Sequence, residues 1–318
     1  MKLLFQFSGE HPGLPKAELL AVLEGEHLDY RIHDFQKKSR LMLVEIEKRT
    51  ASFINRLALT KKSAIYVGAS KTAEGAAQLL EKVLKKNKTF RVRGYSNSLD
   101  VELGGLLHEK GFVVDLHKPD VEVSTFELDG ITVGINLPLK KNFEERKPQF
   151  RPYFHPTSMH PKIARVLVNL ARVKKGDVVL DPFCGTGGIL IEAGLIGCKM
   201  IGQDISNEMV EGCKRNIEFY GLMGRIKKSD TLKEKLPQAD AIVTDPPYGR
   251  SSYSSDDVLL LYNNFIKKSH ESVRKNGFAV IVVPNSIKPK LGRFKLIEKF
   301  DLRVHKSLTR RILVLRKR

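Results

Sequence analysis

Hydrophobic residues recur along the chain with two different periods, and each period predicts one kind of element. In the first half, short apolar runs predict strands over residues 3–7, 41–47, 64–68 and 89–93. Apolar residues at helical spacing predict helices over residues 14–23, 51–57 and 72–84. The first half is therefore expected to contain both strands and helices.

From Lys162 onward the predicted elements alternate regularly. Helices are predicted over residues 163–170, 189–195 and 208–220. Strands are predicted over residues 177–180, 199–203, 225–228 and 241–243. Strands that alternate with helices are typical of a doubly wound, mostly parallel sheet. The second half is therefore expected to have a Rossmann-like α/β fold.

The charge is distributed unevenly and indicates a boundary between the two halves. Residues 1–150 carry 24 Lys and Arg against 20 Asp and Glu, a net charge of +4, whereas residues 151–318 carry 31 against 16, a net charge of +15. Prolines crowd the join, where they interrupt regular structure; they are Pro138, Pro148, Pro152 and Pro156. We interpret residues 138–156 as a linker.

The composition of the whole chain favours an anionic partner. Its 318 residues include 55 Lys and Arg against 36 Asp and Glu, a formal net charge of +19. Cations near phosphates release condensed counterions, so this charge favours binding to a nucleic acid. The sequence has no apolar run of the ~18 residues that a transmembrane helix needs, and no signal pattern follows Met1. A soluble, cytoplasmic protein with no membrane partner is therefore expected.

The cysteines do not form a recognisable metal site. Cys184, Cys198 and Cys213 make no C-x-x-C pair, and none lies beside a histidine at metal-ligand spacing. No bound metal is predicted, and reduced thiols are expected. Because Cys184 lies inside a glycine-rich segment, a nucleophilic thiol is the alternative interpretation for that residue.

That glycine-rich segment follows the strand predicted at 177–180. It reads Asp181-Pro-Phe-Cys-Gly-Thr-Gly-Gly188 and leads directly into the helix at 189–195. Gly185 and Gly187 permit a tight turn and let backbone amides approach a ligand, whose negative end is favoured at the helix N-terminus. We predict that Asp181, Gly185 and Gly187 bind a cofactor. A plain strand-to-helix connection and a dinucleotide site remain alternatives.

Acidic residues end the next two strands. Asp204 follows the strand at 199–203, and Asp230 follows the strand at 225–228. A carboxylate at the first position accepts hydrogen bonds from ribose hydroxyls in nucleotide and adenosylmethionine sites. Asp230 is placed to accept a hydrogen bond from an adenine amine. The alternative for both residues is an ordinary surface turn, where Asp is favoured in any case.

The sequence Asp245-Pro-Pro-Tyr-Gly249 ends the apolar strand at 241–243. An amine conjugated to a base attacks a methyl donor poorly, because its lone pair is drawn into the ring. The Asp245 carboxylate and the rigid Pro246 carbonyl are suited to accept hydrogen bonds from the two N–H groups of this amine. They would thereby stabilise the positive charge that develops on its nitrogen. Tyr248 is placed to stack on a flipped base, and Arg250 to meet phosphate or base. The alternative is a turn without chemistry.

A run of cations in the first half has no carboxylate within it. Phe90 lies within this run, and Tyr95 follows it. Basic residues with interleaved aromatic ones predict an RNA-facing edge, and the alternative is a solvated helix end favoured by the helix dipole. The predicted RNA-binding residues are Lys82, Lys85, Lys86, Lys88, Arg91 and Arg93.

Together, the segment 181–188 and the motif Asp245-Pro-Pro-Tyr-Gly-Arg-Ser251 resemble those of the amino-methyltransferases that carry an N-terminal THUMP domain. Within that group the sequence is most similar to the archaeal tRNA guanine-10 N2-methyltransferases. The segment Arg151-Pro-Tyr-Phe-His-Pro-Thr-Ser-Met-His160 also resembles the family's entry into its catalytic domain, which lines the cofactor site. Thr157 is the candidate there for a contact to the cofactor carboxylate. His155 and His160 are expected to be structural.

The resemblance implies methyl transfer from S-adenosyl-L-methionine to the N2 amine of a tRNA guanine, giving N2-methylguanosine and N2,N2-dimethylguanosine. It implies a class I methyltransferase domain over residues 157–318, preceded by an α+β module. That module would comprise a ferredoxin-like domain over 1–55 and a THUMP domain over 56–137, which together hold the acceptor end of tRNA. Eukaryotic members work with a small zinc-binding activator subunit. We expect a monomer that binds tRNA one to one, with an activator subunit as an open alternative.

Three other functions are compatible with parts of the pattern. An enzyme of the same class would act on a guanine at another tRNA position, such as position 6. A DNA amino-methyltransferase would share the Asp-Pro-Pro-Tyr chemistry but would have a target-recognition domain in place of the first half. A non-catalytic RNA-binding module would be expected to have lost Asp245 or the glycine-rich segment, and both are intact.

Overall fold

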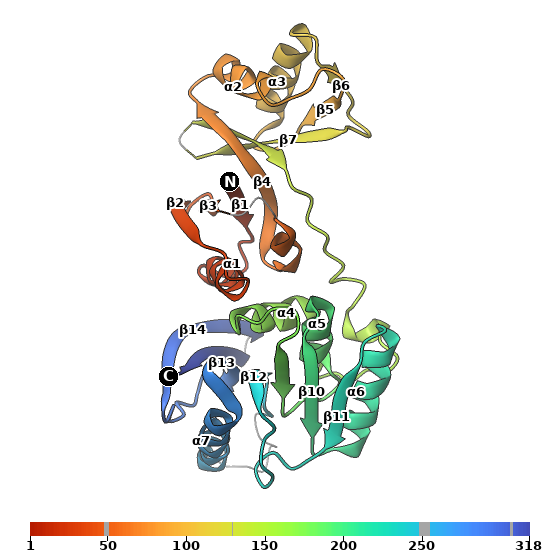
Figure 1. Cartoon of the computed structure of the whole chain (residues 1–318), viewed down its shortest axis with the longest axis vertical. Coiled ribbons are helices and arrows are strands. Elements are labelled where there is room, and N and C mark those ends of the chain that lie inside the picture. The colour runs from red at the N-terminus through yellow and green to blue at the C-terminus, as the bar shows by residue number, and fades with distance from the viewer. Residues whose placement is uncertain (48–50, 129, 248–254, 306–307) are drawn as a thin grey trace. The chain divides into compact units, whose positions relative to one another are not determined.

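The computed structural model describes residues 1–47, 51–128, 130–247, 255–305 and 308–318, and Figure 1 labels most of their helices and strands. The chain divides into two compact units. Unit 1 contains residues 1–12, 28–55 and 59–140, and unit 2 contains residues 13–27, 56–58 and 141–318.

Unit 1 is built on one eight-stranded sheet. Its strands lie in the order β2-β3-β1-β4-β8-β7-β5-β6. Neighbouring strands are antiparallel, except that β5 is parallel to both β6 and β7. The bounds are β1 (Lys2–Phe7), β2 (Tyr30–Gln36), β3 (Leu41–Ile46), β4 (Thr60–Ser70), β5 (Thr89–Val92), β6 (Val113–Val114), β7 (Val121–Glu127) and β8 (Ile131–Asn136).

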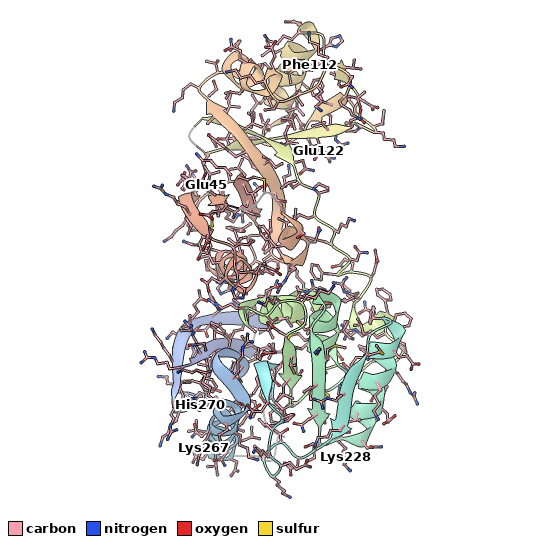
Figure 2. All side chains as sticks on the ribbon, in the orientation of Figure 1. Glu45, Phe112, Glu122, Lys228, Lys267 and His270 are labelled. Atoms are coloured by element: carbon pink, nitrogen blue, oxygen red, sulfur yellow. The ribbon has the colours of Figure 1, made fainter. Side chains whose placement is uncertain are left out.

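Two helices of unit 1 pack on this sheet, α2 (Ala73–Glu81) and α3 (Asn97–Glu109). Each begins at a hydroxyl residue that caps it: Thr72 accepts from the Gly75 amide, and Ser96 accepts from the Leu99 amide. Their apolar faces share a core with Phe112, which is labelled in Figure 2 and meets Phe90 edge to face at 6.4 Å. Over residues 51–57, where a helix is predicted, the chain forms a short 3-10 helix, η1 (Ser52–Arg56).

The predicted boundary between residues 55 and 56 falls between β3 and β4. Both strands belong to the same sheet, in which β1 lies between them. Residues 1–55 contribute β1, β2 and β3, and residues 56–137 contribute the other five strands. The assignment of these segments to a ferredoxin-like and a THUMP domain stays a prediction.

Unit 2 contains a seven-stranded sheet in the order β11-β10-β9-β12-β13-β15-β14. The first five strands are parallel, and β15 is antiparallel to both β13 and β14. A parallel-rich α/β sheet is confirmed for the second half. The bounds are β9 (Val178–Asp181), β10 (Lys199–Asp204), β11 (Gly224–Lys228), β12 (Ala239–Thr244), β13 (Val273–Pro284), β14 (Phe294–His305) and β15 (Leu308–Lys317).

The helices of unit 2 cover this sheet. Helix α5 (Gly188–Ile196) packs on β9 and β10, α6 (Asn207–Phe219) packs on β10 and β11, and α7 (Ser255–Ser272) packs on β13. Further elements are α4 (Pro161–Leu170) and the 3-10 helix η2 (Pro148–Phe150). The largest core cluster joins α7 to the sheet and includes Tyr262, Phe265, Ile281 and Leu315. None of the helices within the described ranges is both long and apolar enough to cross a membrane.

Helix α1 (Leu14–Gly25) comes early in the chain but packs on α4 of unit 2. A buried polar network joins them. Glu18 accepts from the Ala58 amide at 2.7 Å and from the Asn169 side chain at 2.8 Å. Arg56 donates to the Val173 carbonyl at 2.8 Å. Glu18 and Asn169 have no exposed surface, so unit 2 depends on residues that precede most of unit 1.

The order of the unit 2 strands reverses beside β9, at the kind of position where open α/β sheets form a crevice. After β9 the chain runs outward to β10 and β11, and it then returns to form β12 on the other side of β9. The loops that leave β9 and β12 therefore diverge at the carboxyl edge of the sheet. Ligands of open α/β sheets bind at such a point, where the strand order reverses.

Candidate active site

The loop after β9 turns sharply into α5, and two glycines permit the turn. Gly185 and Gly187 have φ angles of +48° and +85°, a left-handed conformation that glycine adopts without strain. A Cβ on Gly187 would lie 2.7 Å from the Cys213 sulfur on α6, so the loop passes close to that helix. The amides at the start of α5 lie at the carboxyl edge of the sheet, where an anionic group is favoured.

Asp181 lies beneath this loop, and its side chain is 1% exposed. Its Oδ1 accepts hydrogen bonds from the Thr244 hydroxyl at 2.6 Å and from the Phe183 amide at 3.2 Å. Because Thr244 is the last residue of β12, the first bond ties the ends of β9 and β12 together. Burial raises the pKa of Asp181 to about 7. The carboxyl group therefore stabilises the loop through its hydrogen bonds to Phe183 and Thr244. Its contact with a cofactor stays a prediction.

Asp204 ends β10 and holds the glycine-rich loop from the other side. Its Oδ2 accepts from the Gly185 amide at 2.9 Å, and its Oδ1 accepts from the Ser206 amide at 2.9 Å. A carboxylate has about four acceptor positions, so Asp204 can also accept from ligand hydroxyls. The next residue, Ile205, is 65% exposed and places an apolar surface beside the carboxylate.

Asp230 follows β11, whose last residue, Lys228, is labelled in Figure 2. The Asp230 Oδ1 accepts from the Leu232 amide at 3.0 Å and so closes a turn. The Thr231 hydroxyl donates to the Pro182 carbonyl at 2.6 Å. This bond ties the turn to the loop after β9, so Asp204 and Asp230 lie along one edge of the sheet.

The segment 151–160 is bound to the glycine-rich loop. The Asn216 side chain on α6 pairs with both the amide and the carbonyl of Tyr153, and it also donates to the Thr186 carbonyl, each at 2.9 Å. Ser158 and Thr186 lie hydroxyl to hydroxyl at 2.9 Å. Thr157, the predicted cofactor contact, is exposed between these anchors, and its hydroxyl lies 2.8 Å from the His155 Nδ1.

Two other elements contact the loop after β12. Arg310 on β15 places its Nη1 3.4 Å from the Asp245 Oδ2, and these side chains are 16% and 17% exposed. The Tyr262 hydroxyl on α7 donates to the Pro246 carbonyl at 3.2 Å. Burial raises the pKa of Tyr262, and the charge of Asp245 raises it further. The phenol is therefore a donor at neutral pH. The predicted residues Tyr248 and Arg250 lie outside the described residues.

These loops place two kinds of chemistry on either side of one crevice. After β9 and β10 there are glycine amides, the Asp204 carboxylate and an apolar side chain, which suit a ligand with an anionic group, ribose hydroxyls and a base. After β12 there are a carboxylate and a carbonyl, which are acceptors only. The second side therefore suits a group with N–H bonds, such as an amine.

Family models match both this region and a part of the chain before it. A model described as an RMKL-like methyltransferase domain matches residues 148–311, which contain all the loops of the crevice. A model described as a DNA methylase matches residues 31–215 and ends before Asp245.

Curated relatives match almost the whole chain. A tRNA (guanine(10)-N2)-dimethyltransferase from Methanothermobacter thermautotrophicus is 35% identical over 335 aligned residues, which cover 99% of this chain and 99% of the relative. The chain belongs to the tRNA (guanine(10)-N2)-dimethyltransferase family. A member of this family from Methanocaldococcus jannaschii is 31% identical and covers 98% of this chain and 99% of its own.

A solved structure supports the fold. TrmN from Thermus thermophilus matches with a TM-score of 0.57 at 20% identity, covering 100% of both chains. The class I methyltransferase fold predicted for the second half of the present chain is confirmed.

The six cations predicted to contact RNA lie in unit 1, where the structure divides them into two groups. Arg91 donates through its Nε to Glu122 at 2.8 Å, and the Lys88 Nζ lies 3.3 Å from Asp120. Both carboxylates precede or belong to β7, so the cationic stretch itself does not reveal them. The others have no ion-pair partner within 4 Å in the described part of the chain, and they are Lys82, Lys85, Lys86 and Arg93. Their contact with RNA stays a prediction.

Sequence analysis did not identify three residues that line or support the crevice. Ile205 has a local signal, because an apolar residue directly after an acidic strand end lies where a base would bind. Tyr262 and Arg310 have no such signal. They reach the loop after β12 from α7 and β15, and only the folded sheet brings these elements together.

Proposed function

We propose that this protein transfers methyl groups from S-adenosylmethionine to the N2 amine of guanine 10 in tRNA. The observation that carries the proposal is the position of Asp245 and the Pro246 carbonyl. They stand across the strand-order reversal from the glycine-rich loop and Asp204. Membership of the tRNA (guanine(10)-N2)-dimethyltransferase family over the whole chain supports the substrate.

The residues along β9, β10 and β11 fit S-adenosylmethionine, which supplies the methyl group when bound. Gly185 and Gly187 keep the amides at the start of α5 open to it. Asp204 accepts from the ribose hydroxyls, and Ile205 offers an apolar surface to the adenine. Asp230 accepts from the adenine amine.

On the N-terminal side of the same loop, Thr157 contacts the cofactor carboxylate. Its exposed position between two anchored neighbours supports this role. Asp181 contributes by holding the loop.

The guanine amine lies against Asp245 and the Pro246 carbonyl. Each acceptor accepts a hydrogen bond from one N–H group, which favours the pyramidal nitrogen and stabilises its developing positive charge. Tyr248 stacks on the flipped base, and Arg250 contacts phosphate or base. When the nitrogen gains the methyl group, the Asp245 carboxylate accepts one of its protons and releases it to solvent, so the methylated amine keeps one N–H group. One acceptor therefore still has a partner during a second transfer. This supports dimethylation as the final product.

Mapping the methylated nucleotide tests the proposal. Purified protein, an unmodified tRNA transcript and labelled S-adenosylmethionine should give N2-methylguanosine and then N2,N2-dimethylguanosine at position 10, read by nuclease digestion and mass spectrometry. A transcript with adenine at position 10 should lose the product. Product that persists at another guanine, such as guanine 6, would reassign the position. Duplex DNA should take up no label, and labelled DNA with unlabelled tRNA would refute the proposal.

We further propose that the protein acts in the cytoplasm as a monomer on one tRNA, with unit 1 holding the acceptor end. Lys82 and Lys85, which are exposed and form no ion pair among the described residues, support the contact of unit 1 with RNA. Turnover by the purified chain without an added subunit would show that no activator is needed. A stable dimer in light scattering would contradict the one-to-one complex.

A further inference from the structure

The loop after β12 contains an unusual stretch of backbone. Pro246 and Pro247 are adjacent, and neither has an N–H group with which to hold the loop. In this stretch only carbonyls and side chains are available as anchors. The position of the two proposed acceptors therefore depends on groups that reach them from other elements.

Tyr262 is one such group. It has no exposed surface and belongs to the core cluster between α7 and the sheet. Its hydroxyl donates to the Pro246 carbonyl at 3.2 Å. A buried phenol needs a hydrogen-bond partner, and a carbonyl has two lone pairs. One lone pair is directed to Tyr262, and the other is available to a substrate N–H.

Arg310 is a second such group, and charge explains why a cation is needed there. Asp181, Asp204 and Asp245 end three neighbouring strands, and the charges of Asp204 and Asp245 both act to keep the Asp181 carboxyl protonated. Carboxylates that share a site disfavour one another's ionised form, whereas an adjacent cation favours it. Arg310, 3.4 Å from Asp245, supplies that cation.

We propose that Tyr262 and Arg310 are positioning residues for the methyl transfer: Tyr262 fixes the Pro246 carbonyl, and Arg310 keeps the Asp245 carboxylate ionised and in place. The inference rests on the proposed function, because it assigns these two acceptors to the guanine amine. Both anchors belong to rigid elements, α7 and β15, as acceptors that must hold a reactive geometry require.

The two roles predict different responses to pH. Among the described residues, the charged and titratable groups seen to act on Asp245 or its neighbours include Asp181 on β9, Asp204 on β10, Tyr262 on α7 and Arg310 on β15. Without Arg310, Asp245 takes up a proton more readily, so the acid limb of the rate profile moves to higher pH. Without the Tyr262 hydroxyl the carbonyl is held less well at every pH, and the limb does not move.

Single-turnover rates at saturating cofactor and tRNA, measured from pH 5 to 9, test both roles. Tyr262→Phe should lower the rate about fivefold at every pH, the scale of one neutral hydrogen bond. Arg310→Gln should lower the rate about tenfold at pH 7 and move the acid limb up by about one pH unit. Arg310→Lys keeps the charge but not the planar fork, so the acid limb of its rate profile should lie at the wild-type pH. Dissociation constants for cofactor and tRNA should stay within about twofold.

Two matched controls exist, one on β15 and one in unit 1. Arg311, next to Arg310 on β15, pairs with Asp301 on β14 at 2.7 Å, so Arg311→Gln removes a similar ion pair away from the loop. Tyr66→Phe removes a phenol from β4 of unit 1. Both controls should keep the wild-type rate and profile.

Wild-type rates in Tyr262→Phe and Arg310→Gln would overturn the proposal while leaving guanine N2-methylation intact. Weaker tRNA binding by Arg310→Gln with an unmoved limb would show that Arg310 contacts RNA instead, and would also overturn it. If Arg310→Gln does not fold, Arg310→Lys decides, because a limb displaced upward in that variant contradicts the assigned role of the charge. A wild-type enzyme that methylates no guanine N2 would refute the proposed function itself.

Discussion

Asp245 must be an anion to stabilise the positive charge that develops on the amine, yet it directly follows β12, in a sheet where β9 and β10 end in two other carboxyl groups, Asp181 and Asp204. Its pairing with Arg310 reconciles these demands. The same pairing means that removal of the Asp245 carboxylate can also lower the stability of the fold, because it leaves the largely buried Arg310 guanidinium without this partner. A test of its chemistry therefore has to separate a loss of charge from a loss of folding.

Asp245→Asn and Asp245→Ala make that separation. Both should lower the single-turnover rate of methyl transfer about 10²-fold or more, the scale of losing one preorganised electrostatic group. Asn keeps the size and one acceptor, so its thermal stability and cofactor affinity should stay near those of the wild type. Rates, melting temperatures and both binding constants are measured together. A near-normal rate in Asp245→Asn would limit the role of the residue to shaping the turn.

Asp181 predicts how stability depends on pH. Burial raises its pKa from 3.8 to about 7 in the folded protein. Between these values the folded state keeps a proton that the unfolded chain has released, so the free energy of unfolding falls as pH rises through this window. Asp181→Asn removes the titration but keeps an acceptor for Thr244 and Phe183. We expect the variant to be more stable than the wild type at pH 8, by on the order of 3 kcal/mol.

Urea unfolding of wild type and Asp181→Asn at pH 5, 6.5 and 8 checks this prediction. Groups that do not interact with Asp181 titrate alike in the two proteins, so the difference between them reports Asp181 together with its coupling to Asp204 and Asp245. The advantage of the variant should shrink as pH falls toward 4. Parallel stability curves would mean that the buried carboxyl group is ionised throughout the range.

At the scale of elements, the glycine-rich loop depends on both backbone conformation and close packing. Gly187→Ala adds a Cβ at a φ of +85° and 2.7 Å from the Cys213 sulfur. Gly176→Ala adds one at a φ of +92° with no other heavy atom within 4 Å. The strain of a left-handed alanine is common to both, roughly 1 kcal/mol. Gly187→Ala should lose about 1–3 kcal/mol more through overpacking.

The two variants also differ in function. Only Gly187 lies in the proposed cofactor loop, whereas Gly176 precedes β9 at the opposite edge of the sheet. Gly187→Ala should therefore weaken S-adenosylmethionine binding in calorimetry, and Gly176→Ala should not. Equal losses of stability and unchanged affinity in both variants would show that the loop tolerates a side chain.

Most of the parallel sheet was predictable from local pattern. The strands and helices from α4 to β12 begin and end within two residues of their predicted bounds, because buried parallel strands are short apolar runs that alternate with amphipathic helices. The parallel strand β13, the antiparallel strands β14 and β15 and the helix α7 were not predicted, and neither were β2, β6, β7, β8 and α3 of unit 1. In β14 charged residues interrupt the apolar ones, as at Glu298, Lys299 and Asp301, so no short window stands out as a strand.

The candidate site divides in the same way. Asp204 and Asp245 could be proposed from the sequence because each lies at the end of an apolar strand, and Gly185 because it lies in the glycine-rich loop after another. Parallel strands bring such positions to one edge. Tyr262 and Arg310 act through contacts between elements distant in sequence, which no window contains. Helix α1 shows the same limit, because its contact with α4 depends on Glu18 and Asn169, which are 151 positions apart.

For the whole molecule, the distribution of charge predicts how the two units contribute to binding. Unit 2 contains most of the net positive charge, because residues 151–318 carry +15 and residues 1–150 carry +4. A segment with so little net charge attracts RNA only through cations that are not already neutralised. In unit 1, Lys82 and Lys85 are exposed and unpaired among the described residues, whereas Lys88 faces Asp120.

The salt dependence of tRNA binding distinguishes these cations. Each phosphate contact contributes about 0.7 to 0.9 to the slope of log affinity against log salt. Neutralising Lys82 and Lys85 to Gln should therefore reduce the slope by about 1.4 to 1.8 and weaken binding at low salt. The control, Lys88→Gln with Asp120→Asn, removes an ion pair without changing the net charge and should leave the slope unchanged. Equal slopes in wild type and the Lys82, Lys85 variant would mean that this edge of unit 1 does not contact tRNA, and that the excess charge of unit 2 provides the phosphate contacts alone.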